Sequence, residues 1–281
     1  PSCLVSDKKP NPPDESRDAE APSRKSYRSI LTEEIVAGTT ELRRPARGLF
    51  LSSLSAGLDV GFSLLLMAAV LTLTRGQFSS ATQHLLVANM YSVGFILVLL
   101  GRSELFTEHT ALAVLPMFDG RATLRGVARV WTIVFAGNQV GAIVFATAAW
   151  AIGPSLGVID SQALTYIATK LTDHPWWVIL FSAVLAGWLM GELAWLLAAG
   201  RDTISQVVFV WLVTTSIGLL NLHHAIAGSV EVFAGMLASP DITFVDFAVF
   251  LLLATVGNAI GGVVFVAIIK YGHAIHGGER N

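Results

Sequence analysis

Residues 101–110 read GRSELFTEHT, and this polar stretch stands in the middle of an apolar segment that runs from about residue 82 to 117. The segment is longer than the roughly 20 residues that one α-helix needs to cross a bilayer. A second interruption, NLHHAIAG at residues 221–228, stands inside the apolar segment 204–238. Because backbone groups in lipid must be hydrogen-bonded within the protein, each interruption predicts a spanning helix that breaks against protein or beside a wet cavity.

Four more apolar segments have the length and composition of membrane spans. They cover residues 48–74, 124–152, 176–200 and 243–271. Of the 281 residues, 53% are hydrophobic and only 14% are charged, whereas ordinary soluble domains have about 25% charged residues. The sequence therefore predicts an all-α membrane protein with six transmembrane helices, of which the second and the fifth are broken.

The positive charges indicate how these helices are oriented. Fifteen Lys and Arg residues fall on the predicted side that carries both termini, and two, Arg75 and Lys170, fall on the other side. Since Lys and Arg concentrate on the cytoplasmic side of membrane proteins, we expect cytoplasmic N- and C-termini in a multi-pass protein of the cell inner (plasma) membrane. Residues 153–175 would then form an external loop.

A short motif recurs in the third and sixth segments. It reads GNQVGA at residues 137–142 and GNAIGG at residues 257–262. Each copy closes a set of three predicted helices whose middle member is broken, and because three is an odd number the two sets would insert in opposite directions. Inverted repeats whose broken helices meet near the bilayer centre are typical of transporters. We therefore expect two inverted three-helix repeats.

The two ends of the chain differ from the membrane region. Residues 1–28 are rich in Pro, Ser and charged residues, a composition that buries too little apolar surface to fold, and we expect a disordered cytoplasmic arm there. Residues 29–46 place apolar residues near helical spacing with glutamates opposite, which predicts an amphipathic helix at the membrane surface. The transmembrane channel domain would occupy residues 47–272, and residues 273–281 would be a cytoplasmic tail.

Several function classes lack their characteristic residues. The chain has one cysteine, Cys3, so it can form neither an intrachain disulfide nor a Cys/His zinc cluster. The net charge of −2 gives no indication of a nucleic-acid partner. The sequence contains no Ser-His-Asp order, metal-ligand cluster or phosphate-binding loop. We therefore expect a protein that is not an enzyme, needs no metal or cofactor, and contacts membrane lipid and a small solute.

These motifs together resemble the formate/nitrite transporter family over about residues 30–272. The resemblance is carried by the two Gly-Asn-x-x-Gly elements and by ELFT at 104–107, HAIA at 224–227, SAG at 55–57, and Trp188-Leu189 with Trp195. It implies a homopentamer of aquaporin-like protomers with a separate pore through each. It also implies passage of small monovalent anions or their conjugate weak acids, such as formate, nitrite, lactate or hydrosulfide.

The resemblance also implies roles for particular residues. His224 matches the family's central histidine, which apolar constrictions flank, and Ile217 falls where family members often have a constriction phenylalanine. The residues that match the family's loop at the second-helix break are Leu105, Phe106 and Thr107. We expect these five residues to line the solute path. Three polar residues are expected to support the helix breaks instead: Glu104, Asn138 and Asn258.

The sequence departs from the family pattern at several positions. Where the family commonly has Glu, Asn, Asn and Lys, this chain has His223, Gly228, Gly187 and Gln206. Four ionisable residues are added within the predicted spans, namely Asp59, Glu108, His109 and Glu192. Together with His223 and Gln206, these four are candidate selectivity residues, because ionisable groups inside spans are costly and commonly mark a pathway.

Two functions remain open from the sequence. In the first, the chain is a channel or transporter for small monovalent anions or their conjugate weak acids, and His224 assists by a hydrogen bond, a positive charge or a proton. In the second, the added Asp and Glu residues change the substrate to a cation, a neutral solute or a proton-coupled substrate. The two functions differ in whether the added acidic residues face the solute path.

Overall fold

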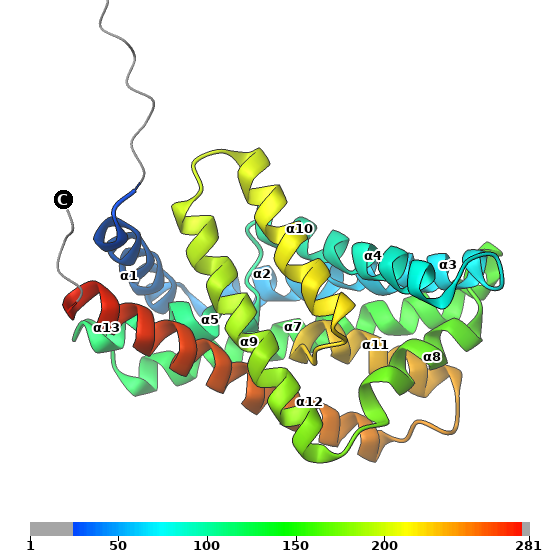
Figure 1. Cartoon of the computed structure of the whole chain (residues 1–281). Coiled ribbons are helices and arrows are strands. Elements are labelled where there is room, and N and C mark those ends of the chain that lie inside the picture. Colours follow the sequence, from blue (N-terminus) through cyan, green and yellow to red (C-terminus); the bar gives the residue numbers. More distant parts are fainter. Residues whose placement is uncertain (1–24, 277–281) are drawn as a thin grey trace, which may run out of the picture.

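The computed structural model describes residues 25–276, and every regular element in this part of the chain is helical (Figure 1). This confirms the prediction of an all-α protein. The elements in chain order are α1 (Tyr27–Arg43), α2 (Ala46–Asp59), α3 (Gly61–Thr74), α4 (Ser80–Leu100), α5 (Phe106–Leu112), α6 (Leu115–Phe118), α7 (Leu124–Ile152), η1 (Pro154–Leu156), α8 (Ser161–Thr172), α9 (Trp176–Ala199), α10 (Thr203–Leu219), α11 (Ala225–Ala238), α12 (Phe244–Ile260), the π-helix η2 (Gly261–Ile268) and α13 (Ile269–His276). Residues 1–24 of the predicted arm and 277–281 of the predicted tail lie outside the described residues.

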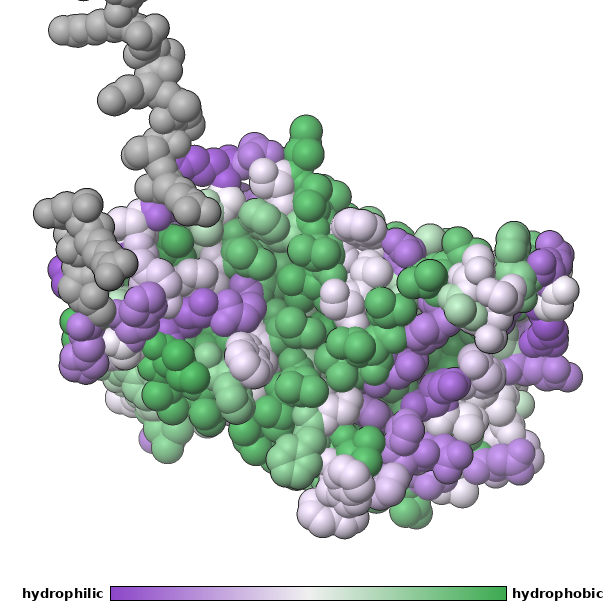
Figure 2. All heavy atoms as spheres, in the orientation of Figure 1, coloured by the Kyte–Doolittle hydropathy of each residue, from purple (hydrophilic) through white to green (hydrophobic). Residues whose placement is uncertain are grey.

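The long helices have the apolar character of membrane spans. Five helical stretches of the described chain are long and apolar enough to cross a bilayer: Ala46–Thr74, Ser80–Leu100, Leu124–Ile152, Trp176–Ala199 and Phe244–His276. Helices α10 and α11 are apolar but shorter. Figure 2 shows apolar residues over the middle of one face and polar residues gathered towards the ends that carry α1 and α8. An apolar band between polar ends is what a bilayer requires of a spanning protein.

The predicted second and fifth segments are each broken. Helix α4 ends at Leu100 and α5 begins at Phe106, whereas α10 ends at Leu219 and α11 begins at Ala225. In each break the second residue after the helix has a positive φ, 55° at Arg102 and 48° at Asn221. No other non-glycine residue of the described chain has a positive φ. Since side-chain-bearing residues rarely adopt this conformation, its recurrence indicates that the two breaks use equivalent turns.

Two glycines permit the close helix pairs that flank the breaks. Helix α2 packs along α7, and α9 packs along α12. A Cβ atom at Gly57 would lie 2.2 Å from the carbonyl oxygen of Asn138, and a Cβ atom at Gly187 would lie 2.2 Å from that of Asn258. Backbones can approach this closely only where the residue has no side chain. Gly187, which departs from the family pattern, is therefore required by the packing of this chain.

Two helices outside the spans pack onto the protein. Helix α1 buries Ile30, Leu31 and Ile35 in an apolar cluster with residues of α6, α7 and α9. Helix α8 lies within the stretch expected to be an external loop, and it buries Leu164 and Ile167 on the side that packs against α11. The apolar face of each helix is thus covered by protein, and α8 forms a wall beside the second helix break.

Candidate functional site

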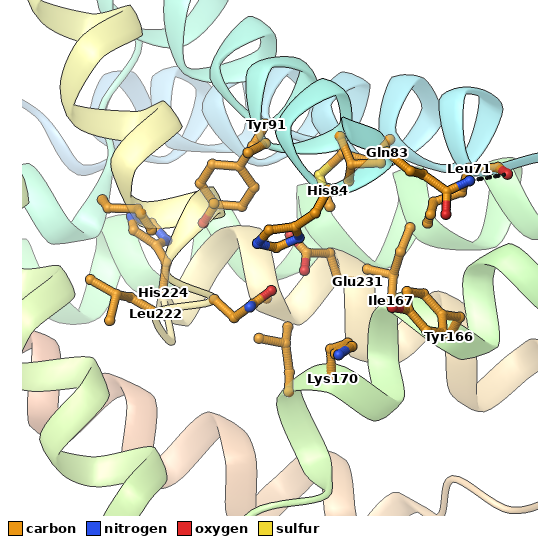
Figure 3. A pocket seen from close by; sticks show the side chains of 18 of the residues that line it. Leu71, Gln83, His84, Tyr91, Tyr166, Ile167, Lys170, Leu222, His224 and Glu231 are labelled. Carbon is orange, nitrogen blue, oxygen red and sulfur yellow. Dashed lines mark hydrogen bonds between the residues drawn. The ribbon is translucent and has the colours of Figure 1, made fainter. Parts of the chain in front are cut away.

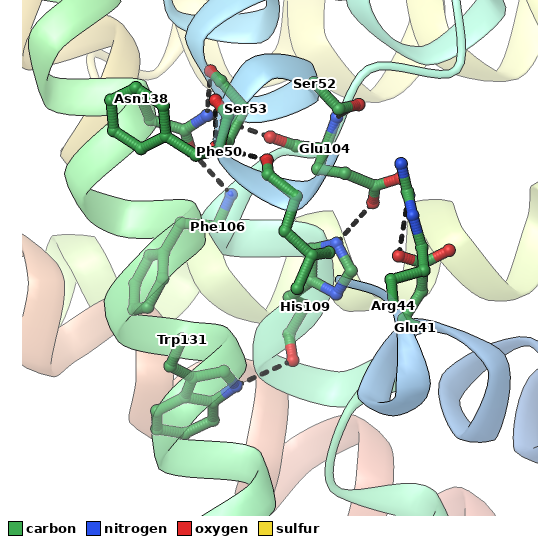
Figure 4. A network of polar contacts seen from close by, with 11 residues as sticks. Glu41, Arg44, Phe50, Ser52, Ser53, Glu104, Phe106, His109, Trp131 and Asn138 are labelled. Carbon is green, nitrogen blue, oxygen red and sulfur yellow. Dashed lines mark hydrogen bonds and ion pairs between the residues drawn. The ribbon is translucent and has the colours of Figure 1, made fainter. Parts of the chain in front are cut away.

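Asn138 on α7 holds the backbone of the first helix break. Its side-chain oxygen accepts a hydrogen bond from the amide of Phe106 (2.8 Å), the first residue of α5. Its side-chain nitrogen donates to the carbonyls of Glu104 (2.8 Å) and of Ser53 on α2 (2.7 Å). Figure 4 shows these bonds converging on the break. One side chain thus satisfies backbone groups that the end of a helix leaves without partners.

Asn258 on α12 makes the corresponding three bonds at the second break. It accepts from the amide of Ala225 (2.8 Å), the first residue of α11, and donates to the carbonyls of His223 (3.0 Å) and of Ala183 on α9 (2.8 Å). Asn138 and Asn258 are both fully buried. The two halves of the chain therefore fix their broken helices by the same set of contacts.

His224 caps the N-terminus of α11 and uses both ring nitrogens. Its Nδ1 accepts hydrogen bonds from the amides of Ile226 and Ala227, each at 3.2 Å. Because Nδ1 accepts, the neutral ring carries its hydrogen on Nε2, which donates to Oγ1 of Thr107 at 2.9 Å. The ring of Phe95 lies edge-on at 5.0 Å between centroids, and His224 is 1% exposed. The bond to Thr107 joins the two helix breaks.

His223 points to a different part of the fold from its neighbour. Its Nδ1 lies 2.8 Å from Oγ of Ser182 on α9, and its Nε2 lies 3.0 Å from the carbonyl oxygen of Leu171 on α8. A carbonyl only accepts, so Nε2 donates to Leu171 and Ser182 donates to Nδ1. His223 therefore ties the second break to α8 and α9.

A cavity of about 100 Å³ lies beside the second break, with walls from α3, α4, α8, α10 and α11 (Figure 3). Ile217 and His224 line it, and Thr107 adjoins it through the bond to His224. Leu105 and Phe106 are buried but do not line this cavity. The ring of Phe106 packs instead against aromatic rings of α7. The structure thus brings together three of the five residues predicted to line the path.

An ion-pair network connects the first break to the end of α1. Arg44 pairs with Glu41 (2.8 Å) and with Glu104, and Nε2 of His109 lies 2.5 Å from the carboxylate of Glu104 (Figure 4). The indole of Trp131 donates to the carbonyl of His109 at 2.9 Å. Donor atoms of Glu41, Glu104 and His109 lie within 4.8 Å of one another. The carboxylates of Glu41 and Glu104 already pair with Arg44, and that of Glu104 also pairs with Nε2 of His109, so their ligand atoms are occupied and the group does not fit a metal ion.

The family model of the formate/nitrite transporters matches residues 28–272 of this chain. The chain belongs to the formate/nitrite transporter family. Its relative "Inner membrane protein YfdC" of Escherichia coli (strain K12) is 32% identical over 244 residues, which are 83% of this chain and 74% of that protein. The resemblance predicted from the sequence motifs is thereby confirmed, and the family consists of channels and transporters rather than enzymes.

Solved structures of the formate/nitrite transporter family share the fold of this chain. An FNT family ion channel matches with a TM-score of 0.78 and 23% identity, covering 86% of this chain and 97% of that one. A pentameric formate channel with formate bound matches with a TM-score of 0.67 and 22% identity, covering 80% and 96%.

The cavity of this formate/nitrite transporter family member has ionisable lining residues that the sequence analysis missed. They are His84, Tyr91, Tyr166, Lys170 and Glu231. Glu231 carries a signal that could have revealed it, because it is the only ionisable residue between 225 and 238 and follows His224 by seven residues. Seven residues are about two helical turns and return to the same helix face. The other four residues come from α4 and α8, so no local spacing connects them with His224.

Two of the added acidic residues have partners away from the cavity. Asp59 accepts a hydrogen bond from Oγ of Ser55, one turn earlier on α2, at 3.1 Å. Glu192 forms an ion pair with Lys270 at 2.9 Å. Neither residue lines the cavity. The carboxylate of Asp59 thus bonds within its own helix, and that of Glu192 connects α9 to α13.

Glu108 and Gln206 also lie off the cavity. Glu108 is in the first turn of α5, where the positive end of the helix dipole favours a negative charge. The side-chain nitrogen of Gln206 reaches the carbonyl of Leu197 at 3.5 Å, between the start of α10 and the end of α9. The six candidate selectivity residues are therefore distributed over several sites of the fold.

We expect the docking of α1 to depend on pH through Glu34. It lies on the buried face of α1, and burial, together with the carboxyls of Glu108 and Glu33, raises its pKa from 4.5 to about 8. The docked helix therefore holds this proton more tightly than the undocked helix does. The stability that Glu34 contributes is fully present below the ordinary pKa of 4.5 and is lost as the pH rises towards about 8.

We expect hydrogen–deuterium exchange of the α1 amides, corrected for intrinsic rates, to become faster as the pH rises through this window. The Glu34→Gln variant should lose this pH dependence, because its side chain cannot ionise. Glu33→Gln serves as the matched control, since Glu33 is more exposed and pairs with Lys25. This variant should keep the pH dependence but move it to slightly lower pH, because one carboxyl that raises the pKa of Glu34 is removed. If amide exchange of α1 in Glu34→Gln depended on pH as in the wild type, Glu34 would not be the group responsible.

Proposed function

We propose that this chain is a channel or transporter for small monovalent anions or their conjugate weak acids, such as formate and nitrite. The observation that carries the proposal is the buried hydrogen bond between His224 and Thr107, which joins the two helix breaks beside the cavity. The N-terminus of α11 points its positive dipole end at this break, which favours an anion. Entry of an unpaired charge into such a buried site costs several kcal/mol. Either the dipole of α11 or protonation of the anion must therefore offset this cost.

The proposed assembly is a homopentamer with a pore through each protomer and a central histidine, His224, between apolar constrictions. The relative whose structure is described as a pentameric formate channel with formate bound supports this assembly through its shared fold. The buried Ile217 beside His224 supports an apolar constriction at that level. We extend the path past Leu105, Phe106 and Thr107 at the first break.

The proposed membrane arrangement has six spans in two inverted three-helix repeats, with both termini in the cytoplasm and the protein in the inner membrane. The matched turns at Arg102 and Asn221 and the matched contacts of Asn138 and Asn258 support the repeats. Within this arrangement residues 1–28 are the disordered arm, 29–46 the surface helix, 47–272 the channel domain and 273–281 the tail.

The alternative of a cationic, neutral or proton-coupled substrate was motivated by acidic residues in the spans. Three of them, Asp59, Glu108 and Glu192, lie off the cavity, which favours the weak-acid function. The acidic residue that does line the cavity is Glu231, and an altered specificity would have to act through it.

The proposal is tested by uptake into proteoliposomes that contain the full chain. Formate, nitrite, hydrosulfide, ammonium and the neutral solute formamide are compared with protein-free liposomes. We expect formate and nitrite uptake to exceed the protein-free rate by roughly tenfold or more, and ammonium uptake to equal it. Ammonium uptake without formate uptake, or no uptake of any solute, would refute the weak-acid function.

A further inference from the structure

Glu231 places a carboxyl group on the wall of the cavity that also contains His224 (Figure 3). The residue is 4% exposed, and its Oε1 has no hydrogen-bond partner among residues 25–276. It forms no ion pair with any described residue. Polar atoms this deeply buried nearly always have partners. Because the residue also lines the cavity, a molecule or proton that enters the cavity is the available partner for this carboxyl group.

The titratable groups that share the cavity with Glu231 come from three elements. Helix α4 contributes His84 and Tyr91, helix α8 contributes Lys170 and Tyr166, and the second break contributes His224. Helix α3, which also lines the cavity, carries no ionisable residue. A buried carboxylate without a fixed counterion either takes up a proton and becomes neutral or binds a cation.

We propose that Glu231 is the proton-exchanging group of this cavity, which passes its proton to a weak-acid anion before the solute reaches Ile217 and His224. This inference rests on the proposed weak-acid function. In the step, the O–H bond of the protonated Glu231 carboxyl breaks and an O–H bond forms on the permeating anion. The neutral acid moves on, and the Glu231 carboxylate takes a new proton from water at the cavity mouth. No atom is oxidised or reduced.

The other groups of the cavity are less suited to this exchange. Both ring nitrogens of His224 are engaged, with the amides of α11 and with Thr107. His84 donates through Nε2 to the carbonyl of Leu219 at 2.7 Å. The imidazolium, phenol and ammonium groups that His84, Tyr91, Tyr166 and Lys170 can supply belong to classes less acidic than a carboxyl. Proton transfer between two carboxylic acids is close to thermoneutral, which is the condition for efficient general acid catalysis. Glu231 is thus the member of the cavity matched to a small weak acid.

The test compares formate uptake by the wild-type pentamer, Glu231→Gln and Glu231→Asp over a series of external pH values. Loss of the proton donor in Glu231→Gln should reduce uptake roughly tenfold or more near neutral pH. The deficit should narrow as the pH falls, because bulk water then supplies more neutral formic acid. Glu231→Asp should restore part of the flux. Asp59→Asn is the matched control, an acidic residue of a span that does not line the cavity, and its uptake should equal that of the wild type.

A structural role for Glu231 would give a different pattern. In that case Glu231→Gln would reduce the uptake of formate and of formamide by equal factors at every pH, although formamide needs no proton. That result overturns the proposal. Unchanged formate uptake in Glu231→Gln overturns it as well. Faster formate uptake together with loss of methylammonium uptake would assign Glu231 to cation selection instead.

Infrared difference spectroscopy of the wild-type pentamer provides a measurement that does not depend on the stability of Glu231→Gln. Adding formate should remove a protonated-carboxyl band, and Glu231→Asp should shift that band. Absence of the band overturns the inference while leaving the proposed function intact. Absence of formate uptake by the wild-type protein refutes the proposed function itself.

Discussion

Formate uptake by the His224→Phe variant is expected to fall roughly tenfold or more, which corresponds to about 1.4 kcal/mol of barrier or above. A phenyl ring fills the site but can neither donate to Thr107 nor accept from the amides of Ile226 and Ala227. The two helix breaks then lose the side-chain bond that connects them. The measurement is initial formate uptake into proteoliposomes, with size-exclusion chromatography to verify assembly.

One further variant separates the helix cap of His224 from its contact with Thr107, and a second serves as the control. Asparagine is among the best N-cap residues, so His224→Asn should preserve α11 while removing the imidazole, and its uptake should fall as in His224→Phe. His174→Gln, a change at an exposed histidine, should leave uptake at the wild-type level. Undiminished flux in His224→Phe would remove this residue from the mechanism.

Asn258→Ala is expected to prevent assembly of a stable protein. The change leaves the amide of Ala225 and the carbonyl of His223 without their partner, whereas the carbonyl of Ala183 keeps its bond within α9 and loses only a second donor. Each buried polar group left without a hydrogen bond costs roughly 1–3 kcal/mol, and whole domains are stable by only about 5–15 kcal/mol. Two such groups therefore remove a large part of the folding free energy.

Thermal unfolding in detergent and the yield of assembled protein measure this effect. Asn138→Ala should behave in the same way, because it breaks the corresponding three bonds at the first break. Asn89→Ala is the control, since Asn89 lies on α4 and bonds to Trp211 and to its own helix. A wild-type melting temperature in Asn258→Ala would show that the second break is held by other contacts.

The breaks and their supports could be predicted from sequence because their signals are local or repeated. A polar stretch inside an overlong apolar segment marks a break wherever the chain crosses a bilayer. The repeated Gly-Asn-x-x-Gly elements mark positions where small residues let helices approach. In the structure Asn138 and Asn258 accept hydrogen bonds from the first amide of the helix that follows each break.

The partners of the ionisable residues could not be predicted, because they depend on how distant helices pack. Glu104 is two residues from Arg102 in the sequence, yet it pairs with Arg44, and Arg102 is exposed in a turn with φ 55°. Glu192 lies closer in sequence to Arg201 but pairs with Lys270. The sequence shows that an ionisable residue lies inside a predicted span, where burying its charge is costly. It does not show which neighbouring helix the side chain faces.

Arg44 has a consequence for any shortened form of this protein. It binds Glu41, at the end of α1, and Glu104, in the first break, at the same time. A chain that begins after Arg44 would lose the surface helix and would also leave the carboxylate of Glu104 without its cation, next to His109. Altered flux in such a truncated protein would therefore combine the loss of α1 with an unpaired carboxylate at the first break. The variant Arg44→Gln in the intact chain separates these two effects.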